Sequence, residues 1–476
     1  MMIQNENSKL TKSDFLLFCE APRHLWAKKN NSIEQTLSDF DRHLIDEGYV
    51  VESLAREYLE SVFLPENPRA DLIWQKTFRS GPFETRIDVL IYWPDTDSYD
   101  LYEIKSATKP DRKDLYDVAF QVLILKEQID LKHSYLLHLN KEYIRSEELD
   151  LPQVLVAEDV TQKIDALLPE VTELRRMAVV AANATDPNAL PHCLSPRDCP
   201  CLAVCHPNLP DFSIYDIPYL SQKNKSELLR LGIREAKAIP ETFGLNPKQR
   251  LIVERAQTNR ERIDQKTLRG ILDHLEFPLW FLDYETCIQA VPRYAGYHPQ
   301  QQVVFQYSLH QLDELEGNLQ HSGYISITEG DPSKPLLEHL STHLGRPGTV
   351  IVWNKTFEMT RNKEMACLYP EFASFLEDVN ARIYDIGEIV NQGIYLHPGF
   401  KGSWSIKNVL PIMAPELSYQ GLPIHQGDQA SMAWWNITFS DLQESQKKTL
   451  VDELEEYCAL DTLAMVEIYR KLRSLA

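Results

Sequence analysis

The sequence predicts an α/β protein of two domains joined by a helical connector, and three observations support this. Its 476 residues are too many for one hydrophobic core. Short apolar runs bounded by turn residues alternate with polar helical stretches, which is typical of sheets covered by helices. Turn residues at 206–211 separate two parts that each carry a group of acidic residues. We therefore expect domains at 1–206 and 273–476 with a connector at 207–272.

Two apolar runs in the first domain predict a β-hairpin at 84–105, with turn residues at 94–98 between the strands. Residues two apart in a strand face the same side, so Glu103 and Lys105 should project together, and Asp88 on the adjacent strand should reach them. Two carboxylates favour an oxygen-seeking Mg²⁺ or Mn²⁺, and Lys105 would orient an attacking water or offset charge on a phosphate. A solvated hairpin face with an incidental salt bridge is the alternative.

A helical run that begins at Tyr116 places Gln121 where it can meet this hairpin. Together with a Gly48 to Glu52 segment, the order of these motifs resembles the PD-(D/E)XK nucleases of the RecB-like group, which include the CRISPR-associated adaptation nucleases. The resemblance implies a restriction-endonuclease-like fold in which Glu52 joins the two hairpin carboxylates as a metal ligand. Many of these relatives have histidine at the position of Glu52. Asp88, Glu103, Lys105 and Gln121 are the catalytic residues that the resemblance implies.

Four of the eight cysteines stand together, and these are Cys193, Cys199, Cys201 and Cys205. Without a signal peptide or a long apolar stretch, the chain is expected in the reducing cytoplasm, where clustered cysteines favour a metal centre over disulfides. RecB-like nucleases often hold a [4Fe-4S] cluster, and the resemblance implies Cys19, Cys193, Cys199 and Cys205 as its ligands. The family pattern has cysteine directly before the proline, where this chain has Ala21. Three alternatives stay open: Cys201 as the fourth ligand, a tetrahedral Zn²⁺ site with His192 or His206, and a cluster of thiols that binds no metal.

A second acidic group belongs to the C-terminal domain. Residues 277–286 are predicted to form a buried strand that ends in a D-x-E pair, Asp283 and Glu285, on one side of the strand. Near the C-terminus, Tyr457 and Asp461 stand four apart in a helical run and therefore share a face.

The order of these motifs resembles the DEDD exonucleases of the RNase H-like superfamily, in the subtype that carries a tyrosine. The resemblance implies a mixed-sheet RNase H-like domain in which the D-x-E pair and Asp461 bind two divalent ions and Tyr457 positions the attacking water. The family's N-x-x-F-D motif corresponds to a segment that ends in Glu358, whose side chain is one methylene longer than aspartate. Asp385 ends a strand and is interpreted as structural.

Nearly the whole chain is similar to a family of uncharacterised bacterial proteins that fuse a RecB-like nuclease to an RNase H-like exonuclease. The predicted function is a metal-dependent DNA nuclease, an exonuclease on single strands or duplex ends in repair, recombination or defence, with no membrane partner. Two alternatives stay open, an RNA-processing exonuclease and a nucleic-acid-binding scaffold that has lost catalysis.

The charge distribution bears on the substrate, because a net charge of −21 does not favour a polyanion. The connector runs against this trend, since its basic residues outnumber its acids. A basic segment between two nuclease sites would follow the phosphate backbone, whereas the plainer interpretation is a pair of solvated helices. The basic residues are Lys223, Lys225, Arg230, Arg234, Lys237, Lys248, Arg250, Arg255, Arg260, Arg262, Lys266 and Arg269.

Overall fold

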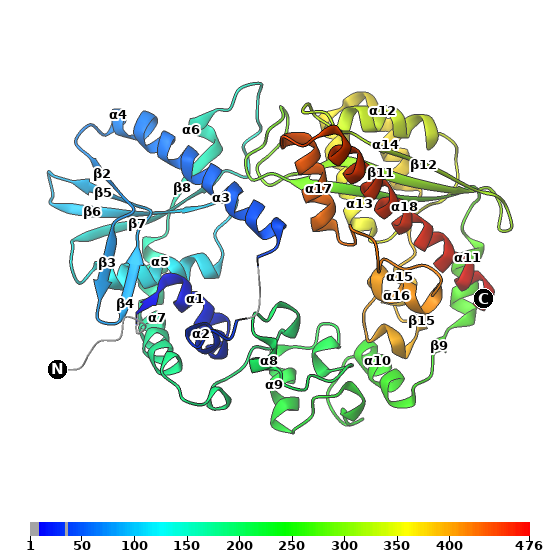
Figure 1. Cartoon of the computed structure of the whole chain (residues 1–476), viewed down its shortest axis with the longest axis horizontal. Coiled ribbons are helices and arrows are strands. Elements are labelled where there is room, and N and C mark those ends of the chain that lie inside the picture. Colours follow the sequence, from blue (N-terminus) through cyan, green and yellow to red (C-terminus); the bar gives the residue numbers. More distant parts are fainter. Residues whose placement is uncertain (1–8, 34–36) are drawn as a thin grey trace. The chain divides into compact units, whose positions relative to one another are not determined.

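The computed structural model describes residues 9–33 and 37–476 (Figure 1). Contacts divide the chain into two compact units. Unit 1 consists of Met1–Asn208 and Gln289–Gln301, and unit 2 consists of Leu209–Ile288 and Gln302–Ala476. Each unit contains a five-stranded mixed sheet with helices, so the predicted α/β class is confirmed. In the described part of the chain, no helix is long and apolar enough to cross a membrane.

Unit 1 is built on a main sheet with the strand order β2-β5-β6-β7-β8, in which β6 and β7 are parallel and the other pairs antiparallel. A smaller sheet has the order β1-β4-β3. The strands are β1 (Leu10–Thr11), β2 (Asp71–Trp74), β3 (Thr77–Ser80), β4 (Phe83–Arg86), β5 (Val89–Trp93), β6 (Ser98–Lys105), β7 (Leu131–Leu139) and β8 (Leu155–Asp159).

Helices cover both faces of the main sheet, because alternate strand residues point to opposite sides. Val89 and Ile91 pack with Val51 of α3, whereas Leu90 packs with Val118 of α5. The α-helices of unit 1 are α1 (Lys12–Glu20), α2 (Pro22–Lys29), α3 (Asp39–Tyr58), α4 (Leu64–Glu66), α5 (Arg112–Leu125), α6 (Leu151–Val154), α7 (Thr161–Ala182) and α8 (Leu202–Cys205). A π-helical turn (Leu59–Phe63) and two 3-10 turns (Pro187–Ala189 and Pro196–Asp198) complete the unit.

The predicted hairpin forms between β5 and β6, but its first strand is shorter than expected. The run 84–92 is divided between β4, which pairs with β1 and β3, and β5, which pairs with β2 and β6. Asp88 lies in the bend between them. The chain therefore changes sheets at this residue, which places the Asp88 side chain beside β6 rather than within a regular strand.

Unit 2 contains a sheet with the order β12-β11-β10-β13-β14. Its β10 strand pairs antiparallel with β11 and parallel with β13. The strands of the unit are β9 (Arg262–Ile263), β10 (Leu279–Ile288), β11 (Gln302–Leu312), β12 (Leu319–Ile325), β13 (Val350–Val352), β14 (Ile383–Asp385) and β15 (Tyr395–Leu396). The expected D-x-E strand is thus central in its sheet.

Helices also cover both faces of this sheet. Phe281 packs in a core with Met465 of α18, whereas Leu282 packs with Met365 of α13. Asp283 and Glu285 lie two and four residues after Phe281 on the same strand, so their side chains also face α18. The helices of unit 2 are α9 (Gln222–Arg230), α10 (Pro247–Thr258), α11 (Gln265–Asp273), α12 (Ser333–His343), α13 (Lys355–Leu368), α14 (Ala373–Ala381), α15 (Glu388–Asn391), α16 (Ile406–Met413), α17 (Gly427–Phe439) and α18 (Glu444–Leu475), with 3-10 turns at Ile214–Asp216, Ala236–Ala238, Pro370–Phe372 and Pro398–Phe400.

The segment 207–272, expected as a connector, packs as part of unit 2 from residue 209 onward. Its β9 pairs antiparallel with β15. Lys248 Nζ donates to Asn391 Oδ1 at 2.5 Å, and Arg262 Nη1 donates to the Gly393 carbonyl at 2.5 Å. Several of its basic side chains therefore hold the fold of this unit.

Residues 289–301, which join β10 to β11 along the chain, belong to unit 1. The Ala290 N–H donates to Glu47 Oε2 at 2.7 Å, and Gln300 Nε2 donates to the Ser106 carbonyl at 2.8 Å. The place of this segment in unit 1 was not expected, because neither partner is near it along the chain.

Candidate functional sites

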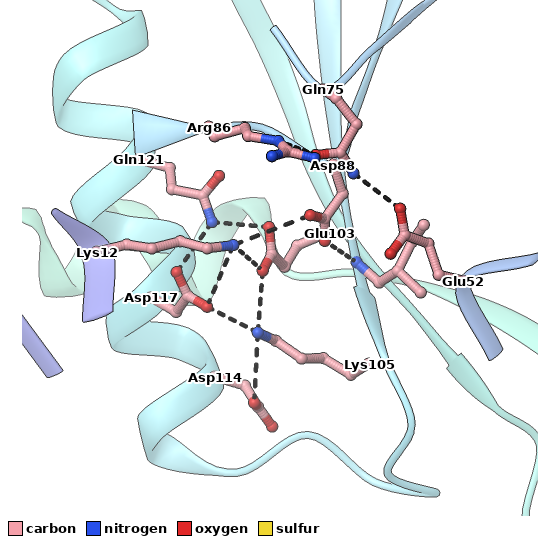
Figure 2. Close-up of polar contacts among 11 residues, drawn as sticks. Lys12, Glu52, Gln75, Arg86, Asp88, Glu103, Lys105, Asp114, Asp117 and Gln121 are labelled. Atoms are coloured by element: carbon pink, nitrogen blue, oxygen red, sulfur yellow. Dashed lines mark hydrogen bonds and ion pairs between the residues drawn. The ribbon is translucent and has the colours of Figure 1, made fainter. Parts of the chain in front are cut away.

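Asp88 and Glu103 lie together in unit 1, and we call their surroundings the Asp88–Glu103 centre (Figure 2). Asp88 Oδ2 accepts a hydrogen bond from the Ile104 N–H at 3.0 Å. Lys105 Nζ donates to Glu103 Oε1 at 3.0 Å, as expected for residues two apart on β6. Gln121 Nε2 on α5 donates to Glu103 Oε2 at 2.8 Å. The structure thus brings together the four residues predicted as catalytic in this domain.

Two further residues of this centre were missed at the sequence level. Lys12, at the start of α1, places its Nζ 2.7 Å from Glu103 Oε1 and 4.0 Å from Asp88 Oδ1. Asp117 on α5 accepts a hydrogen bond from Lys105 Nζ at 2.7 Å and one from Gln121 Nε2 at 2.9 Å. Asp117 could have been found from its i, i+4 spacing to Gln121, whereas Lys12 carries no local signal.

The buried charges of this centre shift one another's proton affinity. Burial, followed by repulsion from Glu103, raises the pKa of Asp88 to about 7. Burial also acts against ionisation of Glu103, but attraction to Lys105 and then Lys12 outweighs it and lowers the pKa of Glu103. Burial acts to lower the pKa values of Lys12 and Lys105. Attraction to the nearby carboxylates outweighs burial, so both pKa values are raised. Glu103 is therefore a carboxylate held between two ammonium groups.

Glu52, expected as a further ligand, is held beside this centre rather than in it. Its Oε1 accepts a hydrogen bond from Gln75 Nε2 at 2.8 Å, and Gln75 in turn accepts one from Arg86 (Figure 2). Among the described residues, no hydrogen bond or ion pair joins Glu52 to Asp88 or Glu103. Glu52 stays a predicted ligand, one of whose carboxylate oxygens is bonded to Gln75.

Four cysteines and two histidines gather in unit 1, and we call this group the cysteine cluster. Its first set of potential ligands is His24, Cys199, Cys201 and Cys205, and its second is Cys193, Cys199 and His206, with all ligand atoms of a set within 4.8 Å of one another. Hydrogen bonds from Cys193 and then Cys201 lower the pKa of Cys199 to about 5. This cluster could hold a metal.

Cys19, expected as the fourth ligand, lies outside these sets. It stands near the end of α1 and packs against hydrophobic residues that include Phe18 and Leu25. Burial, followed by repulsion from Glu170, raises the pKa of its thiol to about 12. His24, on the next helix, belongs to the first set instead, and Cys19 stays a predicted ligand that neither set contains.

Three acidic residues of unit 2 surround Asp283, and we call these four acids the α18 centre. Asp283 and Glu285 lie on β10, Glu358 on α13 and Asp461 on α18. Burial, followed by repulsion from Asp461, raises the pKa of Asp283, and burial followed by repulsion from Asp283 raises the pKa values of Glu285 and Glu358. Asp283 thus interacts electrostatically with each of the other three acids, and Asp283 and Glu285 form with Cys458 a group whose ligand atoms lie within 4.8 Å of one another.

Aromatic hydroxyls and a lysine complete the α18 centre. Burial raises the pKa of Asp461 to about 6, although a hydrogen bond from Tyr419 at 2.5 Å opposes the rise. Tyr457 also bonds Asp461, and Lys407 Nζ lies 3.3 Å from the Tyr457 hydroxyl. Lys407 and Tyr419 were not predicted, since neither belongs to a motif with a fixed spacing to the acids.

Asp385 plays the structural part expected of it. Its Oδ2 accepts a hydrogen bond from the Lys355 N–H at 2.9 Å, and its Oδ1 accepts one from the Gly387 N–H at 3.0 Å. These bonds fix the start of α13, where Asn354 has a left-handed φ of 86°. Asp385 thereby positions the helix that carries Glu358.

Comparison with known proteins adds no activity to this picture. Residues 280–405 match a family described as Domain of unknown function (DUF2779). The chain is 28% identical over 149 residues to the uncharacterized protein UU173 of Ureaplasma parvum, covering 28% of this chain and 22% of the relative. It is 28% identical over 206 residues to the uncharacterized MG366 homolog of Mycoplasma pneumoniae, covering 40% and 31%.

A third relative, the uncharacterized protein MG366 of Mycoplasma genitalium, is 26% identical over 216 residues, covering 41% of this chain and 32% of the relative. The chain thus spans less than a third of the length of these relatives.

Proposed function

We propose that this protein is a metal-dependent nuclease that cleaves DNA at single strands or duplex ends. The observation that carries the proposal is the convergence of four carboxylates in the α18 centre. Glu285, Glu358 and Asp461 are 7%, 1% and 8% exposed. Like charges buried together are unfavourable unless protons or cations compensate them, and divalent cations bound to carboxylates do so at phosphodiesterase sites.

The residues of the α18 centre fit Mg²⁺ or Mn²⁺. Both ions take oxygen ligands, and carboxylates supply them here. Glu358 Oε2 is buried and makes no hydrogen bond in the described part of the chain, so this oxygen is available as a ligand. When bound, the ions would activate a water and offset the charge of the cleaved phosphate. Tyr457, whose pKa is raised by burial and then by Asp461, would keep its proton and orient that water.

The Asp88–Glu103 centre fits the same ions, because its carboxylates already hold a cation, the ammonium of Lys12. Asp88 and Glu103 would be the metal ligands there. Lys105, whose ammonium is fixed by Asp117 and Glu103, would orient the attacking water or offset charge on the phosphate. Gln121 would hold the carboxylate of Glu103 in place.

Sheet topology supports the finer fold assignments. In unit 2, the strand with the D-x-E pair is central, antiparallel to one neighbour and parallel to the other, as we expect for an RNase H-like domain. In unit 1, the E-x-K strand β6 is central in a mixed sheet beside α5, as we expect for a PD-(D/E)XK domain. On this assignment the chain would join two nuclease domains.

The deciding experiment is Mn²⁺-dependent digestion of end-labelled single-stranded and duplex DNA by the full chain. We expect Lys105→Ala and Asp283→Ala each to remove a distinct set of products. Matched controls are Lys132→Ala and Asp441→Ala, which change exposed residues outside both centres. Matched RNA strands distinguish an RNA-processing enzyme. Metal-independent binding without cleavage of either nucleic acid would contradict the proposal and favour a scaffold.

A further inference from the structure

We propose that His24, Cys199, Cys201 and Cys205 bind one Zn²⁺ as a structural site of unit 1, where the resemblance would place a [4Fe-4S] cluster. The proposal concerns the cysteine cluster and does not depend on the nuclease function. It rests on the spacing of the ligand atoms, the identity of the fourth ligand and the carboxylate that lies near it.

The spacing matches a single tetrahedral ion. Zn–S bonds of about 2.3 Å and Zn–N bonds of about 2.1 Å place two sulfurs about 3.8 Å apart and a sulfur–nitrogen pair about 3.6 Å apart. Cys201 Sγ lies 3.7 Å from Cys205 Sγ, and Cys199 Sγ lies 3.5 Å from His24 Nε2. The four ligand atoms all lie within 4.8 Å of one another. One ion at their centre would reach all four.

The same spacing does not fit a [4Fe-4S] cluster. Such a cluster places four iron and four sulfide ions between its cysteine ligands, so the thiolates cannot touch one another. Here Cys201 and Cys205 are in contact. The ligand supplied by the start of the chain is also a histidine, while Cys19 packs in a hydrophobic core. Three thiolates and one imidazole form a Cys₃His set, which is common in structural zinc sites.

A carboxylate lies near the second ring nitrogen of His24. A metal-bound histidine usually directs its second ring nitrogen toward a carboxylate, which fixes the orientation of the ring. His24 Nδ1 lies 3.7 Å from Glu20 Oε2, and Glu20 Oε1 accepts a hydrogen bond from Lys113 at 2.8 Å. His24 itself is 4% exposed. His24 Nδ1 makes no hydrogen bond within the described residues, whereas Nε2 lies 3.5 Å from Cys199 Sγ.

Cys193 and His206 lie beside this set. Cys193 Sγ lies 3.0 Å from His206 Nε2 and also forms hydrogen bonds with Cys199 and Cys205, but it does not belong to the set that contains His24 and Cys201. We assign them a supporting position and not a place among the ligands.

Such a site would tie together distant parts of unit 1. His24 and Cys199 are 175 residues apart in the chain. Linking them through an ion removes freedom from the unfolded chain, and metal binding then contributes to folding. The neighbouring Arg23 already donates to the carbonyls of Leu190 and Val204, so α2 is docked on the same segment.

The test is elemental analysis of the full chain purified without oxygen. We expect one zinc per chain, no iron and no acid-labile sulfide. His24→Ala and Cys201→Ala should lose the zinc, whereas Cys19→Ala and Cys193→Ala should keep it. His24→Cys separates the loss of a ligand from misfolding, because it restores four ligands and should retain zinc.

Exchange of zinc for Co²⁺ in the unchanged chain gives a second measurement. A tetrahedral Co²⁺ site with three thiolates should show intense visible bands, and these bands should shift in His24→Cys. Iron with stoichiometric sulfide, no metal at all, or zinc retained in a folded His24→Ala variant would each overturn the assignment.

Discussion

At the scale of single residues, Lys12 occupies the position where we expect a divalent cation in the Asp88–Glu103 centre. Lys105 makes short contacts with both Glu103 and Asp117, whereas the short contact of Lys12 is with Glu103 alone. The Lys12 side chain also keeps 28% exposure, which gives it a path away from the carboxylates. Metal binding should therefore displace Lys12 and leave Lys105 in place.

From this competition we predict that Lys12→Met strengthens Mn²⁺ binding by about tenfold, or about 1.4 kcal/mol. Methionine has similar length but no charge to compete with the ion. The measurement is a Mn²⁺ titration in an Asp283→Ala background, so that the first centre dominates the signal. Lys132→Met serves as the exposed control. Unchanged or weaker Mn²⁺ binding by Lys12→Met would show that the lysine and the ion do not compete. Loss of Mn²⁺ binding in Asp88→Asn would assign the signal to this centre.

Glu358 offers a second prediction at this scale. Its buried carboxylate has an unbonded oxygen and is repelled by Asp283. Glu358→Gln removes the charge at constant shape, so we expect it to raise the free energy of unfolding in EDTA by about 1 kcal/mol while abolishing cleavage at the α18 centre. Urea unfolding measures the first effect. The exposed Glu371→Gln should change stability by less than about 0.5 kcal/mol, and a destabilised Glu358→Gln would contradict the strain argued here.

At the scale of elements, local patterns predicted well and distant contacts did not. The turn at 94–98 and the alternation of Glu103 and Lys105 predicted the β5–β6 pair and its polar side. The division of 84–92 into two strands was missed, because the apolar pattern continues across Asp88 and only pairing with β1 and β3 breaks it. Lys12 was missed because 91 residues separate it from Glu103.

The contact of α18 with β11 gives a prediction about pH. Burial, followed by repulsion from His321, lowers the pKa of His310 to about 3 from 6.5. His310 Nδ1 bonds the Thr462 hydroxyl of α18 at 2.7 Å, its ring contacts His321 on β12, and Ser308 also faces this seam. Between pH 6.5 and pH 3, His310 is therefore protonated in the unfolded chain but neutral in the folded protein. Stability is unaffected above pH 6.5 and falls as the pH drops from 6.5 toward 3.

We therefore expect His310→Gln to unfold with a weaker acid dependence than the unchanged chain. Between pH 7 and pH 5, the unfolding free energy of the unchanged chain should fall by about 2 kcal/mol more than that of His310→Gln. This figure follows from about 1.4 kcal/mol for each unit of pKa shift. Urea unfolding at the two pH values measures it. The exposed His274→Gln should keep the acid dependence of the unchanged chain, and equal slopes for both variants would rule out a neutral His310.

At the scale of the whole molecule, the chain passes between the two units three times, after residues 208, 288 and 301. Residues 289–301 place Ala290 and Tyr297, 3% and 2% exposed, in unit 1. They also hold Arg145, whose N–H donates to the Tyr297 carbonyl at 3.0 Å and whose Nη1 donates to the Pro292 carbonyl at 2.9 Å. Unit 1 is therefore incomplete without a segment that follows the first strand of the unit 2 sheet.

This division predicts different outcomes for the two units when they are separated. Ile288 and Gln302 are paired across β10 and β11, so a short glycine-rich turn can replace residues 289–301 without disturbing the sheet. Residues 209–476 with this turn should fold cooperatively. Residues 1–208 alone should lose about 2–4 kcal/mol of unfolding free energy, because the surface that Ala290 and Val291 cover is exposed to water. Urea unfolding followed by circular dichroism compares the two, and adding a peptide of residues 289–301 should restore part of the loss. A fragment 1–208 that gains nothing from the peptide would show that the segment is held by unit 1 without stabilising it.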